Sequence, residues 1–139
     1  MKSIGVNRVI IVVKDIEEAR ERYSSLLGIS FWDAGAREDF GLHAMVSWDG
    51  GVELISPLKA DSAVARFLAQ YGESVYAVAF SVPDIKEAET AVRAKGLRIV
   101  GTVDRDESGT FKFFKELIMH PADTRTGRVS IILVQTEPK

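Results

Sequence analysis

A repeat of 69 residues is the feature of this sequence that most restricts its fold. Residues 13–19 (VKDIEEA) match residues 82–88 (VPDIKEA), and the offset is 82 − 13 = 69. A glycine follows each segment, and Gly28 and Gly96 keep this offset to within one residue. A repeated order of elements is typical of a chain built from two copies of one supersecondary unit. We therefore expect two related modules.

Each half of the chain predicts the same series of elements. Residues 6–13 and 75–82 are short apolar, β-branched runs, which favours buried strands. Asp15 and Asp84 follow as N-cap candidates, and apolar residues then recur at helical spacing. Three further strands are expected in each half, at residues 30–34, 42–48 and 52–56 and at residues 97–103, 111–119 and 129–135.

Turns and one connecting helix complete the expected organisation. We expect turns at residues 35–39, 49–51, 104–109 and 121–127, and a linker helix over about 61–71. The chain is then one α+β domain, 1–139, with βαβββ modules at about 5–56 and 74–135. Two such modules can close their apolar sheet faces around a shared cavity, which suits a small ligand.

Composition narrows the classes of partner and site. Cysteine is absent, which excludes disulfides, thiolate nucleophiles and cysteine-based metal sites. The net charge of −2 gives no electrostatic basis for binding nucleic acid or an acidic membrane surface. The first residues (MKSIG) do not resemble a signal peptide, and no apolar run could span a membrane. We expect a cytoplasmic protein that binds neither nucleic acid nor membrane.

Three segments resemble the vicinal-oxygen-chelate superfamily, the group of glyoxalase I, extradiol dioxygenases, bleomycin-resistance proteins and methylmalonyl-CoA epimerase. They are residues 12–19 (VVKDIEEA), 23–28 (YSSLLG) and 52–58 (VELISPL). Residues 62–68 (SAVARFL) and the run leading into 77–85 resemble the epimerase branch in particular. The resemblance covers almost the whole chain and implies a glyoxalase/bleomycin-resistance-type fold of two βαβββ modules.

The resemblance also implies where a divalent metal would be held, with one ligand from each of four strands. The two histidine positions fall on Arg8 and Ala77, the carboxamide or carboxylate on Glu53, and the final glutamate on Ile132. Alanine and isoleucine have no donor atom, and arginine is cationic. Glu53 alone would be a poor site. We therefore expect no metal and no other cofactor.

Arg8 and Glu53 form the sharpest candidate pair. If both side chains point into the same half of the cavity, the guanidinium can take the space of the metal and contact the carboxylate. Two interpretations stay open at this point. The pair binds an anion or a carbonyl group of a ligand, or it is a structural ion pair that binds nothing.

Other candidates have weaker support. His43, Tyr76, Trp48 and Phe114 are expected to help bind a ligand, although a lone strand histidine is more often hydrogen-bonded or exposed, and strand aromatics more often belong to a core. Asp39 lies near the place where the resemblance puts a catalytic glutamate, but it is also an ordinary turn residue. A structural role is expected for a further histidine, at position 120.

Two functions compete, and the sequence leaves open whether the protein is an enzyme. The first is a metal-independent protein that binds a small organic molecule in the cavity between its sheets. The second is an isomerase, epimerase or lyase that transfers a proton, with Glu53 as base and Arg8 stabilising an enolate-like oxygen. A degenerate structural domain without ligand is a third possibility. The resemblance also implies a homodimer.

Overall fold

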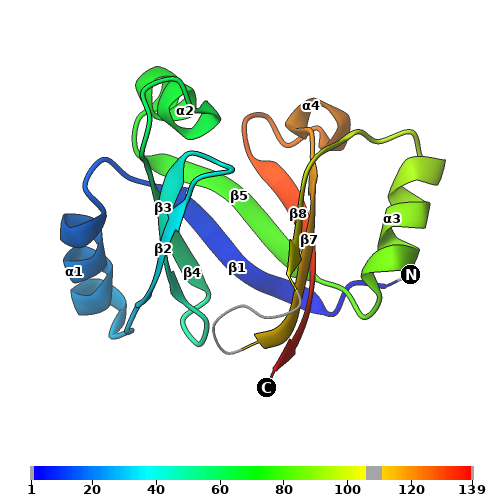
Figure 1. The fold of residues 1–139 in the computed structure, drawn as a ribbon, viewed down its shortest axis with the longest axis horizontal. Coiled ribbons are helices and arrows are strands. Elements are labelled where there is room, and N and C mark those ends of the chain that lie inside the picture. The colour runs from blue at the N-terminus through cyan, green and yellow to red at the C-terminus, as the bar shows by residue number, and fades with distance from the viewer. Residues whose placement is uncertain (1, 106–110, 139) are drawn as a thin grey trace. The chain divides into compact units, whose positions relative to one another are not determined.

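The computed structural model describes residues 2–105 and 111–138, and the chain divides into two compact units. The first unit is residues 8–76, and the second combines residues 1–7 with residues 77–139. Both boundaries fall within a strand, and each of these strands is described with the unit that contains most of its residues. Each unit contains a strand, a helix and three further strands in chain order, which confirms the expected βαβββ fold class (Figure 1). Within the described ranges, no helix combines the length and the apolar character needed to cross a membrane.

The first unit is built on four strands in the order β2-β3-β4-β1. Strands β2, β3 and β4 pair antiparallel, whereas β1 runs parallel to β4. A further helix, α2, follows β4 within the segment expected as a linker helix. The elements are β1 (Gly5–Val12), α1 (Ile16–Leu27), β2 (Trp32–Arg37), β3 (Leu42–Ser47), β4 (Val52–Pro57) and α2 (Ala63–Tyr71).

The second unit repeats this plan in the order β5-β8-β7-β6, with β5 parallel to β8 and the other neighbours antiparallel. The residues 121–127, expected as a turn, contain a short helix, because Pro121 at the first helical position and the His120 side chain satisfy its start. The elements are β5 (Ser74–Ser81), α3 (Ile85–Ala94), β6 (Ile99–Arg105), β7 (Phe111–Met119), α4 (Pro121–Thr124) and β8 (Ser130–Pro138).

Both long helices begin at the aspartates of the repeat. The Asp15 carboxylate accepts a hydrogen bond from the Glu18 backbone N–H at 3.1 Å. The Asp84 carboxylate accepts two, from backbone N–H groups in the first turn of α3. Gly28 ends α1 at φ 66°, a left-handed conformation that glycine adopts without strain. The motif that revealed the repeat is therefore a helix-start motif.

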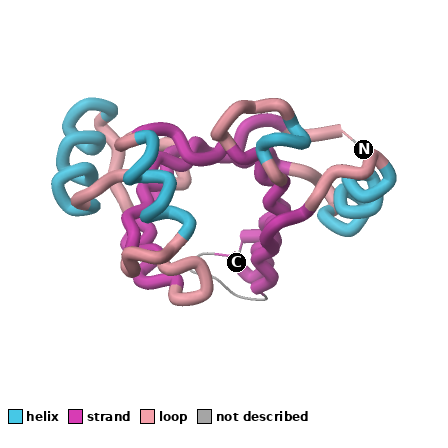
Figure 2. The backbone as a smooth tube through the Cα atoms, turned by 90° about the horizontal axis from the view of Figure 1, so that it is seen from above, coloured by secondary structure: helices cyan, strands magenta, loops and turns pink. Residues whose placement is uncertain are grey.

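Each of these helices lies along one side of the strands of its own unit (Figure 2), and its apolar residues pack against them. In the first unit, Ile16 and Ala19 of α1 pack with Met45 of β3 and Leu54 of β4. In the second unit, the corresponding core contains residues of α3, β7 and β8, and its buried members are Val82, Ile85, Ala88, Val92, Leu117 and Met119. One face of each set of strands is therefore committed to a helix.

Strand β2 corrects the expected turn at residues 35–39. The strand continues to Arg37 because Gly35, at φ 77°, accommodates a bulge instead of a reversal, and the pairing with β3 shifts between Asp33 and Gly35. Strand β6 has a similar shift between Ile99 and Gly101. The turn expected at residues 104–109 lies mostly outside the described residues, since β6 runs to Arg105.

Candidate functional site

The face of the first unit opposite α1 carries its buried polar pair. Leu54 points toward α1, so its neighbour Glu53 points to the other side of the sheet. Glu53 lies in register with Ile10 of β1, and Arg8 is two residues before Ile10 on the same face. The alternation of these two parallel strands therefore brings the two charged side chains together.

Arg8 and Glu53 form a close ion pair. The Arg8 Nε donates to Glu53 Oε1 at 2.7 Å, a distance typical of a charge-assisted hydrogen bond. The Arg8 side chain is 3% exposed and the Glu53 side chain 15%. The pair anticipated from the sequence is thus present, and Glu53 is its more exposed member.

Trp48 completes this group of side chains, which we call the Arg8 cluster (Arg8, Trp48 and Glu53). The indole lies beside the guanidinium, with 5.1 Å between Arg8 Cζ and the ring centroid, the range of a cation–π contact. The turn that carries Trp48 is tied to β1, because the Val9 N–H donates to the Gly51 carbonyl at 2.9 Å. A side chain at the neighbouring Gly50 would come within 2.6 Å of the Ser47 hydroxyl.

The donor atoms of the Arg8 cluster do not fit a divalent metal. A guanidinium is cationic and has no lone pair to offer, and Glu53 Oε1 already accepts a hydrogen bond from it. Divalent metals in proteins need several nitrogen, oxygen or thiolate donors. Among residues 2–105 and 111–138, no group of three or more His, Cys, Asp or Glu side chains is arranged to hold a metal ion.

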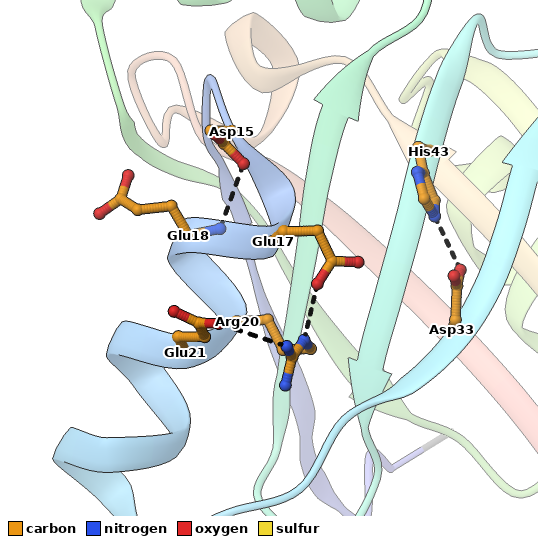
Figure 3. A network of polar contacts seen from close by, with 7 residues as sticks. All are labelled: Asp15, Glu17, Glu18, Arg20, Glu21, Asp33 and His43. Carbon is orange, nitrogen blue, oxygen red and sulfur yellow. Dashed lines mark hydrogen bonds and ion pairs between the residues drawn. The ribbon is translucent and has the colours of Figure 1, made fainter.

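His43 lies on the other face of the sheet from Glu53. It shares a face of β3 with Met45, which packs under α1. Its Nε2 is 2.7 Å from Asp33 Oδ1 on β2 (Figure 3). The same carboxylate oxygen accepts the Gly35 N–H at the bulge. The hydrogen bond to His43 holds the pKa of Asp33 below its usual value. Within the first unit, His43 is therefore part of an edge-strand contact and not of the Arg8 cluster.

The remaining candidates lie on other elements of the two units. Tyr76 packs edge-on against Phe67 of α2, with 4.8 Å between ring centroids, and burial raises the pKa of its phenol. Phe114 is buried in the second unit, on β7. Asp39 is exposed in the turn between β2 and β3. His120 caps α4, where its Nδ1 accepts the N–H of residue 122 at 3.0 Å.

Two polar residues of note were missed from the sequence. Glu116 on β7 is 6% exposed. Its burial was predictable from the sequence, because it lies on the same strand face as the apolar residues Phe114 and Ile118. Asp33 is the partner of His43, and no local spacing pointed to it. The bulge at Gly35 changes the alternation of β2, so a strict count along the strand misplaces its side chains.

Comparison with protein families places the chain in a superfamily. Residues 7–114 match the model of the glyoxalase/bleomycin resistance protein/dioxygenase superfamily. This match spans more than half of the chain. The protein therefore belongs to this superfamily, as the resemblance in its motifs implied.

Known proteins and solved structures are similar over most of the chain. The YqjC protein of Bacillus subtilis (strain 168) is 28% identical over 102 residues, which is 72% of this chain and 73% of that protein. Methylmalonyl-CoA epimerase from Mycobacterium tuberculosis is 28% identical, with a TM-score of 0.81 over 98% of this chain and 90% of that one. A variant of the Streptomyces coelicolor epimerase, in complex with 2-nitronate-propionyl-CoA, is 25% identical, with a TM-score of 0.78 over 96% and 98%.

Proposed function

We propose that this protein binds a small organic molecule at the Arg8 cluster without a divalent metal ion. The observation that carries the proposal is the ion pair of buried Arg8 and partly buried Glu53, with Arg8 Nε 2.7 Å from Glu53 Oε1 and Trp48 beside the guanidinium. A buried charge pair next to an aromatic ring combines a fixed polar group with apolar surface, as ligand sites do. The guanidinium holds the carboxylate in one orientation, which reduces the entropy lost when a ligand binds.

The residues at the strand positions support the proposal that no metal is required. Arg8 occupies the place that the family resemblance gives to a histidine ligand, and Glu53 is directed at Arg8. We expect protein purified without chelator to contain no stoichiometric divalent metal by mass spectrometry. We also expect Ni²⁺, Co²⁺, Zn²⁺, Mn²⁺ and Fe²⁺ to leave its melting temperature unchanged. One tightly held equivalent of any of them would contradict this part of the proposal.

Ligand binding can be measured with benzyl alcohol, whose ring and hydroxyl suit an aromatic surface beside a polar pair. In ¹H–¹⁵N NMR titrations with EDTA present, the Trp48 indole signal should shift saturably. The Arg8→Met/Glu53→Leu double variant should lose this shift, because it keeps the apolar volume and removes both charges. The Glu21→Gln variant, on an exposed carboxylate of α1, is the matched control. An unchanged titration in the double variant would refute the site.

A second candidate is a proton-transfer enzyme, favoured by the likeness to two methylmalonyl-CoA epimerases at 25% identity or more. Glu53 would take a proton from a carbon next to a carbonyl group, and the electron pair of that C–H bond would move onto the carbonyl oxygen as an enolate. The carboxyl group would then return a proton to the same carbon after the enolate had turned its other face to it, which inverts that carbon. Arg8 would stabilise the oxygen charge.

Methylmalonyl-CoA in D₂O separates the two candidates. An enzyme would exchange the hydrogen on the carbon between the two carbonyl groups for deuterium faster than the buffer does, and Glu53→Gln would abolish the excess rate while binding persists. A binding protein shows no excess exchange in either form.

The expected homodimer and cytoplasmic location are also proposals, and light scattering after size-exclusion chromatography would test the dimer.

A further inference from the structure

We infer that the ligand of the Arg8 cluster is a hydrogen-bond donor, neutral or cationic, with a flat apolar group, and that anions are disfavoured there. The inference rests on the proposed function and names its ligand class. It follows from which member of the ion pair is the more exposed and from the Glu53 carboxylate oxygen that does not take part in the pair.

Only one of the two carboxylate oxygens of Glu53 takes part in the ion pair. Its Oε1 accepts the Arg8 Nε hydrogen bond, while its Oε2 makes no hydrogen bond to any residue in the ranges 2–105 and 111–138. An ionised carboxylate can only accept hydrogen bonds, and it has about four lone-pair positions to fill. The polar capacity that remains at this carboxylate is therefore acceptor capacity, which a donor group on a ligand would satisfy.

The orientation of the pair decides the sign of the charge that a ligand meets. Arg8 is the buried member at 3% exposure, and Glu53 keeps 15% of its side chain exposed. An incoming group thus approaches the negative end of the pair, where an anion is repelled and a cation attracted. Because Arg8 neutralises part of this charge, a neutral hydroxyl or amide N–H also fits, and a full positive charge is not required.

Trp48 indicates that the ligand also carries a flat apolar group. Its indole packs against the Arg8 guanidinium at 5.1 Å and is itself only partly buried. A flat apolar group on the ligand would gain contact area beside this ring while its donor reaches Glu53. The cluster therefore fits an alcohol, amide or amine attached to an aromatic or other planar apolar group.

Three probes that share one ring test the charge preference in the whole protein. Benzylamine, benzyl alcohol and benzoate differ in the polar group alone, and each is titrated at pH 7 while the Trp48 indole signal is followed by NMR. We expect benzylammonium to bind about tenfold or more tightly than benzoate, with benzyl alcohol between them. Glu53→Gln should remove this preference, since a neutral amide both donates and accepts, and Glu21→Gln should keep it.

The outcomes distinguish this inference from the proposed function. Benzoate binding as tightly as benzylammonium, or more tightly, would overturn the donor assignment and leave small-molecule binding intact. A Trp48 signal that none of the three probes shifts at millimolar concentration would overturn both. The ranking in the wild-type protein is decisive by itself, so the test does not depend on the folding of the Glu53→Gln variant.

Discussion

The two units hold opposite kinds of residue at matching places in the same framework. In the first unit, β1 and β4 align Ile10 with Glu53, and Arg8 lies two residues before Ile10. In the second unit, β5 and β8 align Ala79 with Ile132, and Ala77 lies two residues before Ala79. The Arg8–Glu53 ion pair therefore corresponds to Ala77 and Ile132, which are 0% and 5% exposed.

This difference shows that one backbone arrangement accepts either a charge pair or an apolar pair at its centre. Replacing a buried ion pair by apolar residues is often neutral for stability, because desolvation of the charges offsets their attraction. Stability alone therefore gives no strong reason for the first unit to keep Arg8 and Glu53. A binding role for the pair agrees with this comparison, and each unit can be altered to resemble the other.

Placing a carboxylate in the second unit should have the largest effect. Ile132→Glu buries a charge beside Ala79 and Val134, on a pair of strands where Ala77 stands at the position that Arg8 has in the first unit. We expect a loss of about 4 kcal/mol in the free energy of unfolding, measured with urea at pH 7. Ile132→Leu is the size control and should cost less than about 1.5 kcal/mol. Equal losses in the two variants would contradict the comparison.

Breaking the Arg8–Glu53 ion pair in the first unit should have the second-largest effect on stability. Arg8→Met leaves the Glu53 carboxylate largely buried and without its cation, at a cost of about 3 kcal/mol. Arg8→Met/Glu53→Leu removes both charges and should recover most of that loss. Urea unfolding of the two variants measures the difference directly. A double variant no more stable than Arg8→Met would show that the unpaired Glu53 carboxylate does not account for the loss.

The N-caps of α1 and α3 also differ between the units, and removing them should have smaller effects on stability. Asp84 accepts two backbone N–H groups of α3, at 3.0 and 3.1 Å, whereas Asp15 accepts one from α1, at 3.1 Å. We expect Asp84→Ala to cost about 1.5 kcal/mol and Asp15→Ala about half as much. Thermal and urea unfolding of both variants would rank them. The reverse ranking would mean that the number of capped N–H groups does not set the cost.

The smallest effects concern two carboxylates with lowered pKa, one in each unit. The Arg98 hydrogen bond lowers the pKa of Asp123 from 3.8 to about 2, and the His43 hydrogen bond lowers that of Asp33. A lowered folded-state pKa stabilises the protein above the unfolded value of 3.8, and this contribution is lost as the pH falls through the folded value.

Carboxyl ¹³C NMR titrations should therefore give an Asp123 midpoint near 2, rising toward 3.8 in Arg98→Gln. The Asp33 midpoint should rise in His43→Gln and stay unchanged in Arg98→Gln, which makes each variant the control for the other. An Asp123 midpoint near 3.8 in the wild-type protein would show that the exposed pair with Arg98 is not maintained in solution.

Much of the fold was predictable from the sequence because its signals are local. The Asp-Ile motif, the helix-ending glycines and the short β-branched runs each act over a few residues, and together they indicated both βαβββ units. The family resemblance placed Arg8 and Glu53 at metal-ligand positions, which made them a candidate pair. Trp48 was expected as a ligand-binding aromatic, whereas its position over the guanidinium depends on a turn held by the Val9–Gly51 hydrogen bond.

The rest depends on contacts between segments that no local pattern reveals. The bulge at Gly35 extended β2 past the expected turn and gave His43 its partner, Asp33. Tyr76 was expected near a ligand, but its ring packs on Phe67 of the connecting helix. Such pairings are decided by tertiary packing, which propensity and spacing do not encode.

The bulges in β2 and β6 have a consequence for how copies of this protein meet. Each of these strands is the last in the order of its unit, and each has a register shift next to a glycine, at Gly35 and Gly101. A regular outer strand is a template onto which another chain can add, which leads to open-ended polymers. A strand whose hydrogen-bond pattern is interrupted by a bulge is a poor template. Both outer strands therefore disfavour the open-ended addition of further copies at high concentration.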